Sequence, residues 1–372
     1  MKVCTITCHD VYNFGASLQA FALQTHLNNA GHAVEIIDYK PDYLSQHFNL
    51  SCVANPIWDR NLLLRTIYLG AKLPGRLRSL KQKRAFDRFT RSRLHLTPHR
   101  YTSNNELRAS PPQADAYICG SDQIWNAHFP NGQDPAFFLD FAPAGKRRIA
   151  YAASLGEDDL PESEIPHFLQ RLQRIGSVSL REESAIPYLR KIGAGPLHHV
   201  MDPVFLLGAE EWTNHFNLTL HASNDYLLVY TFENTRSVDG QLRELASHLG
   251  CEIVSVGPGH CGAASKRLPY IGPGAFLDLV FNAKAVVSSS FHAIAFSIIF
   301  QKPFYTLLRS DGLNSRITNL LATLQVGDRT LQSQGDSSTT PIEFEAVSRV
   351  LLPLIEESAN YLRAALGESQ RV

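Results

Sequence analysis

Residues 2–38 read KVCTITCHDVYNFGASLQAFALQTHLNNAGHAVEIID, and this stretch predicts the architecture of the chain. Apolar, β-rich runs at Lys2–Thr7 and Ala33–Asp38 predict two strands, and an apolar stripe along Ser17–Ala30 predicts a helix between them. Gly31 stands where a helix of this kind is expected to end. A strand, a helix and a second strand in this order form a βαβ unit, whose two strands are parallel.

The same alternation continues along the chain. Further strands are predicted at Ala116–Cys119, Arg148–Ala152, Ser177–Leu180, Tyr226–Phe232, Cys251–Val256, Ala285–Ser288 and Pro303–Leu307. Further helices are predicted at Ile165–Ile175, Ser184–Ile192, Ser237–Leu249, Gly274–Asn282, His292–Phe300 and Ser315–Leu324, with a long one at Pro341–Leu366. We therefore expect an α/β protein with two Rossmann-like, doubly wound halves.

The boundary between the halves is predicted near Asp202–Asp225. There, Asp202-Pro203 and a polar stretch interrupt two βα series of comparable size. We expect an N-terminal domain at residues 1–210, a C-terminal domain at 211–340 and a C-terminal helix at 341–372. A chain of 372 residues is long enough for two domains of this size.

Composition excludes several classes of protein. Lys plus Arg number 35 and Asp plus Glu number 35, so no global charge attracts the chain to nucleic acid. The N-terminus reaches His9 and Asp10 too early for a secretory signal, and no apolar run of about 18 residues follows, so a soluble cytoplasmic protein is expected. No motif for a metal is present, and no metal is expected. Buried free thiols rather than disulfides are expected of Cys4, Cys8, Cys52, Cys119, Cys251 and Cys261.

One interval departs from the pattern. Residues 60–100 carry twelve Lys or Arg residues against the single acid Asp87, a net charge of 12 − 1 = +11. Interleaved apolar residues predict basic amphipathic helices in an insertion at about residues 56–100. Two interpretations stay open: the insertion packs its apolar side on the sheet, or Arg60–Arg100 makes a peripheral contact with an anionic membrane. Nucleic acid is not expected as a partner, because no binding motif accompanies the charge.

Ligands of open α/β sheets collect at the carboxyl ends of the strands, where polar residues follow two of the predicted strands in the first half. Asn13 and Gly15 follow the first strand, where they either form a structural turn or open the helix to a polar ligand. The run Gly120–Asn126 follows another, and its Asp122 and Trp125 suit sugar recognition. The alternative for this run is a helix cap with Trp125 in the core.

The strongest candidate lies in the second half, where Ser288–Ala293 precedes a helix without charged residues. Such a helix is expected to be buried, so only its start can face a cleft. There the hydroxyls of Ser289 and Ser290, free backbone N–H groups and the helix dipole favour an anion such as phosphate. His292 can donate a hydrogen bond or a proton at the same place.

Fixed cations that could accompany this anion site are Arg181, after a strand, and Arg316, at a helix start. The alternative for Arg181 is an ion pair with Glu182 or Glu183, and for Arg316 a solvated helix start. Asp202, before Pro203, is either a helix cap or a base.

Taken together, these motifs resemble the polysaccharide pyruvyl transferase family, over about residues 2–325. The blocks that carry the resemblance are Asn13–Leu23, Gly120–Asn126, Arg181–Glu183, Asp202-Pro203, Ser290–Ala293 and Asn314–Ile317. The resemblance implies two Rossmann-like halves similar to a glycosyltransferase B fold. It also implies transfer of pyruvate from phosphoenolpyruvate to a sugar as a ketal, with phosphoenolpyruvate as a co-substrate and no cofactor.

On this sequence, the resemblance implies a donor site in the second half and an acceptor site in the first. His292 would act as general acid or as a partner of the phosphate, with the donor bound by Arg181, Ser289, Ser290 and Arg316. The acceptor would be a saccharide of a cell-surface or exopolysaccharide precursor, free or lipid-linked, bound by Asn13, Gln19, Asp122 and Trp125. The chain departs from the family at Ser290, where some members carry a basic residue, so one anion contact has to come from elsewhere or is absent.

Two other functions are compatible with the same features. A glycosyltransferase using a nucleotide sugar would also place phosphate at the Ser288–His292 helix start, although the sequence offers no convincing pocket for the nucleotide base. A non-catalytic carbohydrate-binding protein, tethered by its basic segment, is the second alternative.

Overall fold

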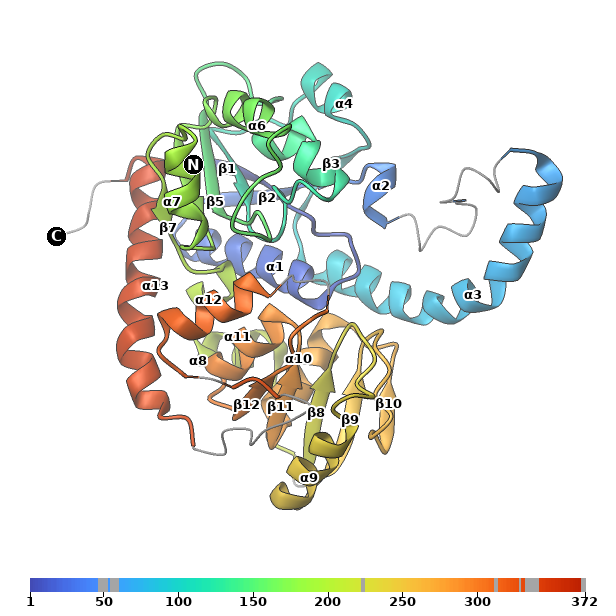
Figure 1. Cartoon of the computed structure of the whole chain (residues 1–372). Coiled ribbons are helices and arrows are strands. Elements are labelled where there is room, and N and C mark those ends of the chain that lie inside the picture. Colours follow the sequence, from blue (N-terminus) through green and yellow to red (C-terminus); the bar gives the residue numbers. More distant parts are fainter. Residues whose placement is uncertain are drawn as a thin grey trace.

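The computed structural model describes residues 1–45, 53, 60–221, 225–310, 314–327, 329–331 and 341–368, and it contains two sheets (Figure 1). The first has the order β3-β2-β1-β4-β5-β6-β7 and the second the order β10-β9-β8-β11-β12. The first sheet consists of β1 (Lys2–Ile6), β2 (Ala33–Tyr39), β3 (Leu96–Tyr101), β4 (Ala116–Gly120), β5 (Arg147–Ala153), β6 (Ser177–Leu180) and β7 (His198–His199). The second consists of β8 (Tyr226–Tyr230), β9 (Glu252–Val256), β10 (Lys266–Leu268), β11 (Ala285–Ser288) and β12 (Phe304–Thr306).

Helices connect these strands. In the first half they are α1 (Phe14–Asn29), α2 (Asp42–Ser45), α3 (Leu62–Arg93), α4 (Asn104–Ala109), α5 (Pro130–Gln133), α6 (Ile165–Leu172), α7 (Ala185–Lys191) and α8 (Ala209–Phe216). In the second half they are α9 (Asp239–Leu249), α10 (Pro273–Asn282), α11 (Phe291–Ile299), α12 (Ser315–Thr323) and α13 (Phe344–Leu366). Short 3₁₀ turns lie at Pro135–Phe138 and Pro203–Leu206.

Both sheets are doubly wound, which confirms the predicted fold class. Every pair of neighbouring strands is parallel, so all strands of one sheet end at the same edge. The strand order reverses between β1 and β4 in the first sheet and between β8 and β11 in the second. These reversals are the positions at which parallel sheets leave a crevice for ligands.

The basic insertion differs from its predicted bounds. The helix α3 ends at Arg93, and Leu96–Tyr101 forms β3 at the edge of the first sheet, whereas residues 56–59 lie outside the described residues. This strand was not predicted because it contains Pro98 and polar neighbours, which are untypical of a strand. Proline is tolerated in strands mainly at the edge of a sheet, where β3 lies. The short strands β7 and β10 also lie at edges and were not predicted, and neither was α8.

One hydrophobic core runs through both halves. Phe14 of α1 stacks on Phe276 of α10 with ring centroids 4.5 Å apart, and it also contacts Tyr230 of β8. The helix α13 spans both halves along one side of the molecule (Figure 1). Its Tyr361 hydroxyl donates to the carbonyl of Ala150 in β5. The boundary predicted at residue 210 stays a prediction, but the sheets themselves divide between β7 and β8.

Two further sequence expectations concern thiols and membrane spans. The five described cysteines, Cys4, Cys8, Cys119, Cys251 and Cys261, are free thiols, and all but Cys251 are buried. Cys52 lies outside the described residues. None of the described helices combines the length and the apolar character that a membrane span requires.

The core shared by the halves predicts a large stability loss for Phe14→Ala. Phe14 is 3% exposed, so the change removes a buried ring between α1 and α10 and leaves a cavity. We expect urea denaturation to show a loss of about 3–5 kcal/mol. Phe129→Ala is the matched control, because that ring is 41% exposed. An equal loss in both variants would contradict the assignment of Phe14 to the shared core.

Candidate active site

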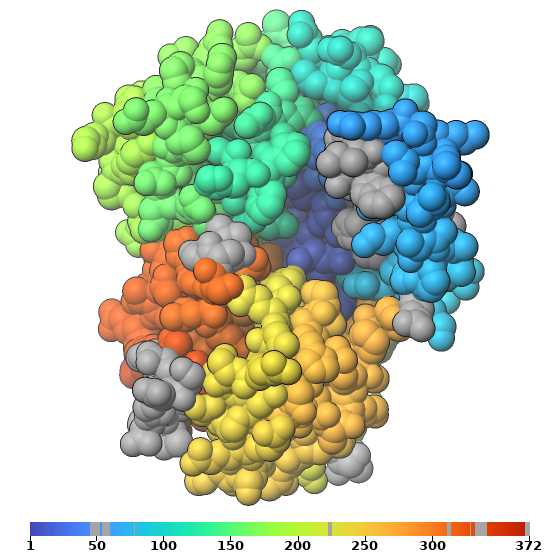
Figure 2. All heavy atoms as spheres, turned by 45° about the vertical axis from the view of Figure 1, so that its right-hand side comes forward, coloured from blue at the N-terminus to red at the C-terminus, as the bar shows by residue number. Residues whose placement is uncertain are grey.

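A cavity of about 350 Å³ lies where the strand ends of the two sheets face each other. The loops after β1 and β4 line it from the first half, and those after β8, β11 and β12 line it from the second. The cavity therefore adjoins the point of strand reversal in both sheets. Figure 2 shows the first βα unit, in dark blue, in a recess between the two lobes and beside α3.

The start of α11 forms one wall of the cavity. Ser289, Ser290 and His292 line it, and Ser290 is the residue that precedes the helix. The backbone N–H of Ser290 donates to the hydroxyl of Ser288 at 3.0 Å, which fixes the turn from strand to helix. Every residue of α11 except Ile299 is buried, as its lack of charge predicted. The N–H groups of its first turn have no acceptor within the helix, so they are available to an anion.

His292 joins the two halves at this wall. Its Nε2 lies 3.5 Å from Oδ2 of Asp202, which is within ion-pair distance but too long for a hydrogen bond. Its Nδ1 lies against Gly15, where a Cβ atom would come within 1.9 Å of that nitrogen. Only a glycine therefore permits the imidazole to rest on the loop after β1. His292 is 5% exposed and borders the cavity.

Asp202 is the carboxylate behind His292. It accepts hydrogen bonds from the Arg181 guanidinium at 2.8 Å, the Ser121 hydroxyl at 2.9 Å and the backbone N–H of Val204 at 3.1 Å. Burial opposes its ionisation, but His292 and Arg181 outweigh burial and hold the pKa of Asp202 well below its usual range. A carboxylate that is ionised and fully engaged caps the turn at Pro203–Leu206 and holds His292, and it is poorly suited to act as a base.

Arg181 lies behind the cavity wall and is not among the residues that line the cavity. Its guanidinium is buried, with Nε 3.3 Å from Glu182 and the group 4.7 Å from the centre of the Phe291 ring. The alternative ion pair with Glu182 is therefore the arrangement found. The positive charge of Arg181 stabilises Asp202 and Glu182.

Arg316 does line the cavity. With the amide of Gln123 turned toward it, the amide oxygen accepts from Nη2 at 2.9 Å and Nε at 3.3 Å. Among the described residues, no carboxylate lies within ion-pair distance of this guanidinium. Burial, and then the charge of Arg181, lower the pKa of Arg316 to about 10, so it stays protonated at neutral pH. A bound anion would offset this crowding of positive charge.

The residues predicted for an acceptor sugar divide into two groups. Asn13 and Asp122 line the cavity, whereas Gln19 and Trp125 are fully buried and do not line it. Gln19 donates to the Thr7 hydroxyl at 2.8 Å. Trp125 stacks on Phe138 at 5.2 Å, so the core alternative describes it correctly. The buried indole of Trp125 thus supports the loop that presents Asp122.

The turn after β4 is strained. Ser121 and Asp122 have φ values of 29° and 62°, in the left-handed region that residues with a Cβ seldom adopt. Such strain persists only where the surrounding structure holds it, and it is frequent at ligand sites. Here the Ser121 hydroxyl is held by Asp202, and the backbone then directs Asp122 and Gln123 to the cavity.

Sequence reasoning missed Arg309 and singled out Gln123 only as part of the run Gly120–Asn126; both line the cavity beside Arg316 and Ser290. Arg309 follows β12 closely, so its place after a parallel strand was the signal that could have found it. Gln123 is hydrogen-bonded to Arg316 across the two halves, which no local pattern encodes. Cys8 also lines the cavity, but burial raises the pKa of its thiol well above its usual range, which disfavours the thiolate that a nucleophile requires.

Among the described residues, no three His, Cys, Asp or Glu side chains are grouped so that they could hold a metal ion. The cavity instead gathers two guanidinium groups and a helix start, a donor set that binds an anion with planar, charge-assisted hydrogen bonds.

The buried cluster of Asp202, Arg181 and Glu182 predicts that Asp202→Asn lowers the free energy of unfolding. The buried guanidinium of Arg181 would lose one of its two carboxylate partners and keep only Glu182, and breaking a buried ion pair typically costs about 3–5 kcal/mol. Because folding lowers the pKa of Asp202, its contribution is complete above about pH 4 and is lost below it. Urea denaturation should therefore show a gap between wild type and variant that is constant near pH 7 and narrows by about 1.4 kcal/mol per pH unit below pH 4.

Asp225→Asn is the matched control for this change. The Asp225 side chain is 75% exposed and lies 3.6 Å from Lys284, so removal of its charge should change stability by less than about 0.5 kcal/mol. A pH-independent gap for Asp202→Asn would argue against an ionised, paired carboxylate.

Comparison with solved structures finds distant likenesses over nearly the whole chain. UDP-GlcNAc 2-epimerase from Methanocaldococcus jannaschii is 15% identical with a TM-score of 0.49, over 97% of this chain and 93% of that one. The same enzyme from Neisseria meningitidis is 12% identical with a TM-score of 0.47, over 98% and 94%. The Escherichia coli heptosyltransferase WaaC with ADP is 14% identical with a TM-score of 0.40, over 96% and 100%. Such distant likeness says nothing about the reaction of this chain.

Comparison with curated protein sequences gives no significant match. The sequence model of one protein family, described as polysaccharide pyruvyl transferase, matches residues 13–311. The matched residues cover most of the chain and include Asn13, Asp122, Asp202 and His292, which the fold brings to one place between its halves. The chain belongs to the polysaccharide pyruvyl transferase family.

Proposed function

We propose that this chain transfers pyruvate from phosphoenolpyruvate to two hydroxyls of a sugar in a bacterial cell-surface or exopolysaccharide precursor, forming a ketal. The observation that carries the proposal is the meeting of Arg316, Arg309 and the start of α11 with His292 in one cavity of about 350 Å³. Phosphoenolpyruvate carries its carboxylate and phosphate close together, so it requires fixed cations and N–H donors rather than a pocket for a nucleotide base. It would be consumed as a co-substrate, and the reaction requires no cofactor.

The donor's anionic groups would bind at the second half of the molecule. Ser289, Ser290 and the first N–H groups of α11 would donate to the phosphate, where the helix dipole adds to the attraction. Arg316, oriented by Gln123, would bind one anionic group with its planar fork of donors. Arg309, whose guanidinium lies 5.1 Å from the centre of the Phe232 ring, would supply the cationic contact that Ser290 does not provide. Arg181 would act only through Asp202.

His292 would act as the general acid. It would give a proton to the methylene carbon, which makes the central carbon electrophilic, and the oxygen of the first sugar hydroxyl would then bond to that carbon. The proton of this hydroxyl would restore His292. In a second step the bond from carbon to the phosphate oxygen would break, the second hydroxyl oxygen would take its place, and the phosphate would leave with the second proton. Asp202 would hold the imidazole ring in position throughout.

The acceptor sugar would lie at the first half of the cavity. Asp122 and Asn13 offer oxygen and nitrogen atoms to sugar hydroxyls, and the exposed ring of Phe129 offers an apolar surface to the sugar face. The acceptor sugar would be either free or attached to a lipid carrier. With a lipid carrier the basic helix α3 would have a role, because it would bring the enzyme to the membrane surface that holds the acceptor.

The proposed acid predicts that His292→Asn lowers kcat by about a hundred- to ten-thousand-fold, the usual contribution of a general acid. The measurement is phosphate release from phosphoenolpyruvate, with the best acceptor from a panel of methyl galactosides, glucosides and mannosides. His221→Asn is the matched control, because that side chain is 53% exposed and lies 3.1 Å from Asp278 at the surface. The role of His292 fails if its variant keeps more than a third of wild-type turnover.

The proposed donor site predicts that phosphoenolpyruvate raises the melting temperature of the wild type and not of Arg316→Met. Arg243→Met, an exposed arginine of α9, should keep the full shift. The same measurement with UDP-glucose and UDP-galactose tests the alternative of a glycosyltransferase. Stabilisation by the nucleotide sugars but not by phosphoenolpyruvate would contradict pyruvyl transfer, and binding of methyl hexosides without phosphate release would indicate a carbohydrate-binding protein.

A further inference from the structure

The long helix α3 has two parts with different surroundings. Near its C-terminal end, Phe86 is 2% and Phe89 is 6% exposed, and a Cβ atom at Gly272 would come within 3.2 Å of Ala85. This part is therefore anchored in the shared core. The N-terminal part extends away from the body of the molecule, and the ribbon bends along the helix that contains Pro74 (Figure 1).

Large apolar side chains are exposed on the projecting part. Leu62 is 80%, Leu63 70%, Ile67 53%, Leu73 43% and Leu77 50% exposed. Apolar side chains stabilise a fold by being buried, so such large exposed fractions show that these five side chains contribute little to the core. Leu63, Ile67, Leu73 and Leu77 follow one another at helical spacing through Gly70, so they share one face of α3.

The same face becomes basic as the helix approaches the body. Lys81, Arg84, Arg88 and Arg91 continue the line at spacings of three and four residues, and all four are exposed. Arg91 has an 81% exposed side chain and its nearest carboxylate oxygen, on Asp87, is 4.0 Å away. One face of α3 thus has an apolar outer part followed by a basic inner part. The outer part is formed by Leu63, Ile67, Leu73 and Leu77, and the inner part by Lys81, Arg84, Arg88 and Arg91. We call this face the docking face.

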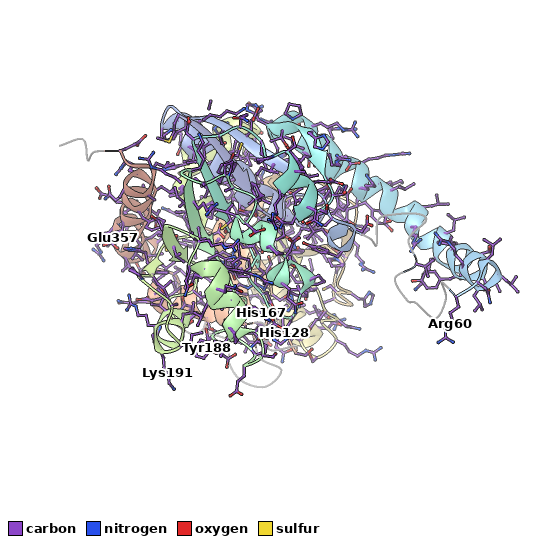
Figure 3. The ribbon with its side chains drawn as sticks, turned by 90° about the horizontal axis from the view of Figure 1, so that it is seen from above. Arg60, His128, His167, Tyr188, Lys191 and Glu357 are labelled. Atoms are coloured by element: carbon purple, nitrogen blue, oxygen red, sulfur yellow. The ribbon has the colours of Figure 1, made fainter. Side chains whose placement is uncertain are left out.

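We propose that the docking face binds an anionic lipid bilayer, with Leu63, Ile67 and Leu77 entering the boundary between headgroups and acyl chains and the basic residues contacting anionic headgroups. An apolar stripe beside a row of Lys and Arg is the pattern of helices that lie in a membrane surface. Residues 60–100 carry a net charge of +11 within a chain whose total charge is zero, so the attraction to anionic lipid is confined to this part of the molecule. Viewed from above, α3 extends far from the body, with Arg60 near its outer end and Lys191 on the opposite side (Figure 3).

The docking face is also connected to the cavity. The Tyr12 hydroxyl donates to Asp87 of α3 at 3.2 Å, and the Tyr12 ring contacts Phe86 edge to face at 5.9 Å. Tyr12 immediately precedes Asn13, which lines the cavity. A membrane bound through α3 would therefore lie next to the loop after β1, where an acceptor carried by a lipid would enter. The membrane contact itself does not require that the proposed reaction be correct.

The test is co-sedimentation of the full chain with vesicles of pure phosphatidylcholine and with vesicles of phosphatidylcholine that contain phosphatidylglycerol as the anionic lipid. We expect binding to the anionic vesicles that weakens at high salt and little binding to the neutral ones. Leu63→Gln with Leu77→Gln should lower the partition coefficient at least about tenfold without changing the melting temperature, because both side chains are exposed. Leu220→Gln with Leu352→Gln, at 72% and 62% exposure, is the matched control and should bind as the wild type does.

A second pair of variants tests the charges. Lys81→Gln, Arg84→Gln and Arg88→Gln together should remove the preference for anionic vesicles, whereas Lys191→Gln, Arg243→Gln and Lys266→Gln, the same loss of charge elsewhere on the surface, should keep it. The proposal is overturned if the docking-face variants bind vesicles as well as their controls do. It is also overturned if light scattering shows a dimer that Leu63→Gln with Leu77→Gln converts to a monomer while vesicles are not bound, since a second copy of the chain would then cover the face.

Discussion

The buried carboxylate of Asp202 is the constraint on which the site depends. An ionised group without contact to water must be neutralised and hydrogen-bonded within the protein. Its partners are Arg181 and Ser121 from the first half and His292 from the second, so the requirement for neutralisation fixes the halves relative to each other at this point. The imidazole is held between this carboxylate and the bare backbone of Gly15. Apolar packing of Phe14 against Phe276 supports the same junction from the side of the core.

The arginines near the cavity have two roles: Arg181 stabilises the structure, whereas Arg316 is available to bind a ligand. The difference follows from how each side chain is buried and paired. Arg181 is enclosed with Asp202 and Glu182, and its charge is used within the protein. Arg316 faces the cavity with an amide as its hydrogen-bond partner, which orients the guanidinium without neutralising it. A cation held by a neutral partner in a partly buried site attracts an anion more strongly than one that is already paired. This difference is why the proposed function assigns donor binding to Arg316 rather than to Arg181.

Much of the fold could be predicted from sequence, because central strands of a parallel sheet are buried on both faces and therefore read as short apolar runs. Strands such as β6 and β11 were predicted with the bounds found. The edge strands β3, β7 and β10 were not, since an edge strand has solvent on one side and tolerates proline and charge. The start of α1 at Phe14 rather than Ser17 follows from Asn13, whose side chain accepts from the N–H of Gly15 and of Ala16.

The sequence alone determined that strands and helices alternate in two doubly wound series, and that polar groups would lie at strand ends and helix starts, among them Asn13, Asp122, Ser290, His292 and Arg316. Hydrophobic period and local turn chemistry are short-range properties, so they can be recognised in the chain itself. Only the tertiary structure decided that Trp125 and Gln19 are buried, that Arg181 neutralises Asp202, and that Gln123 orients Arg316. These outcomes depend on contacts between residues far apart in the chain, and burial and charge pairing exist only after both halves have come together.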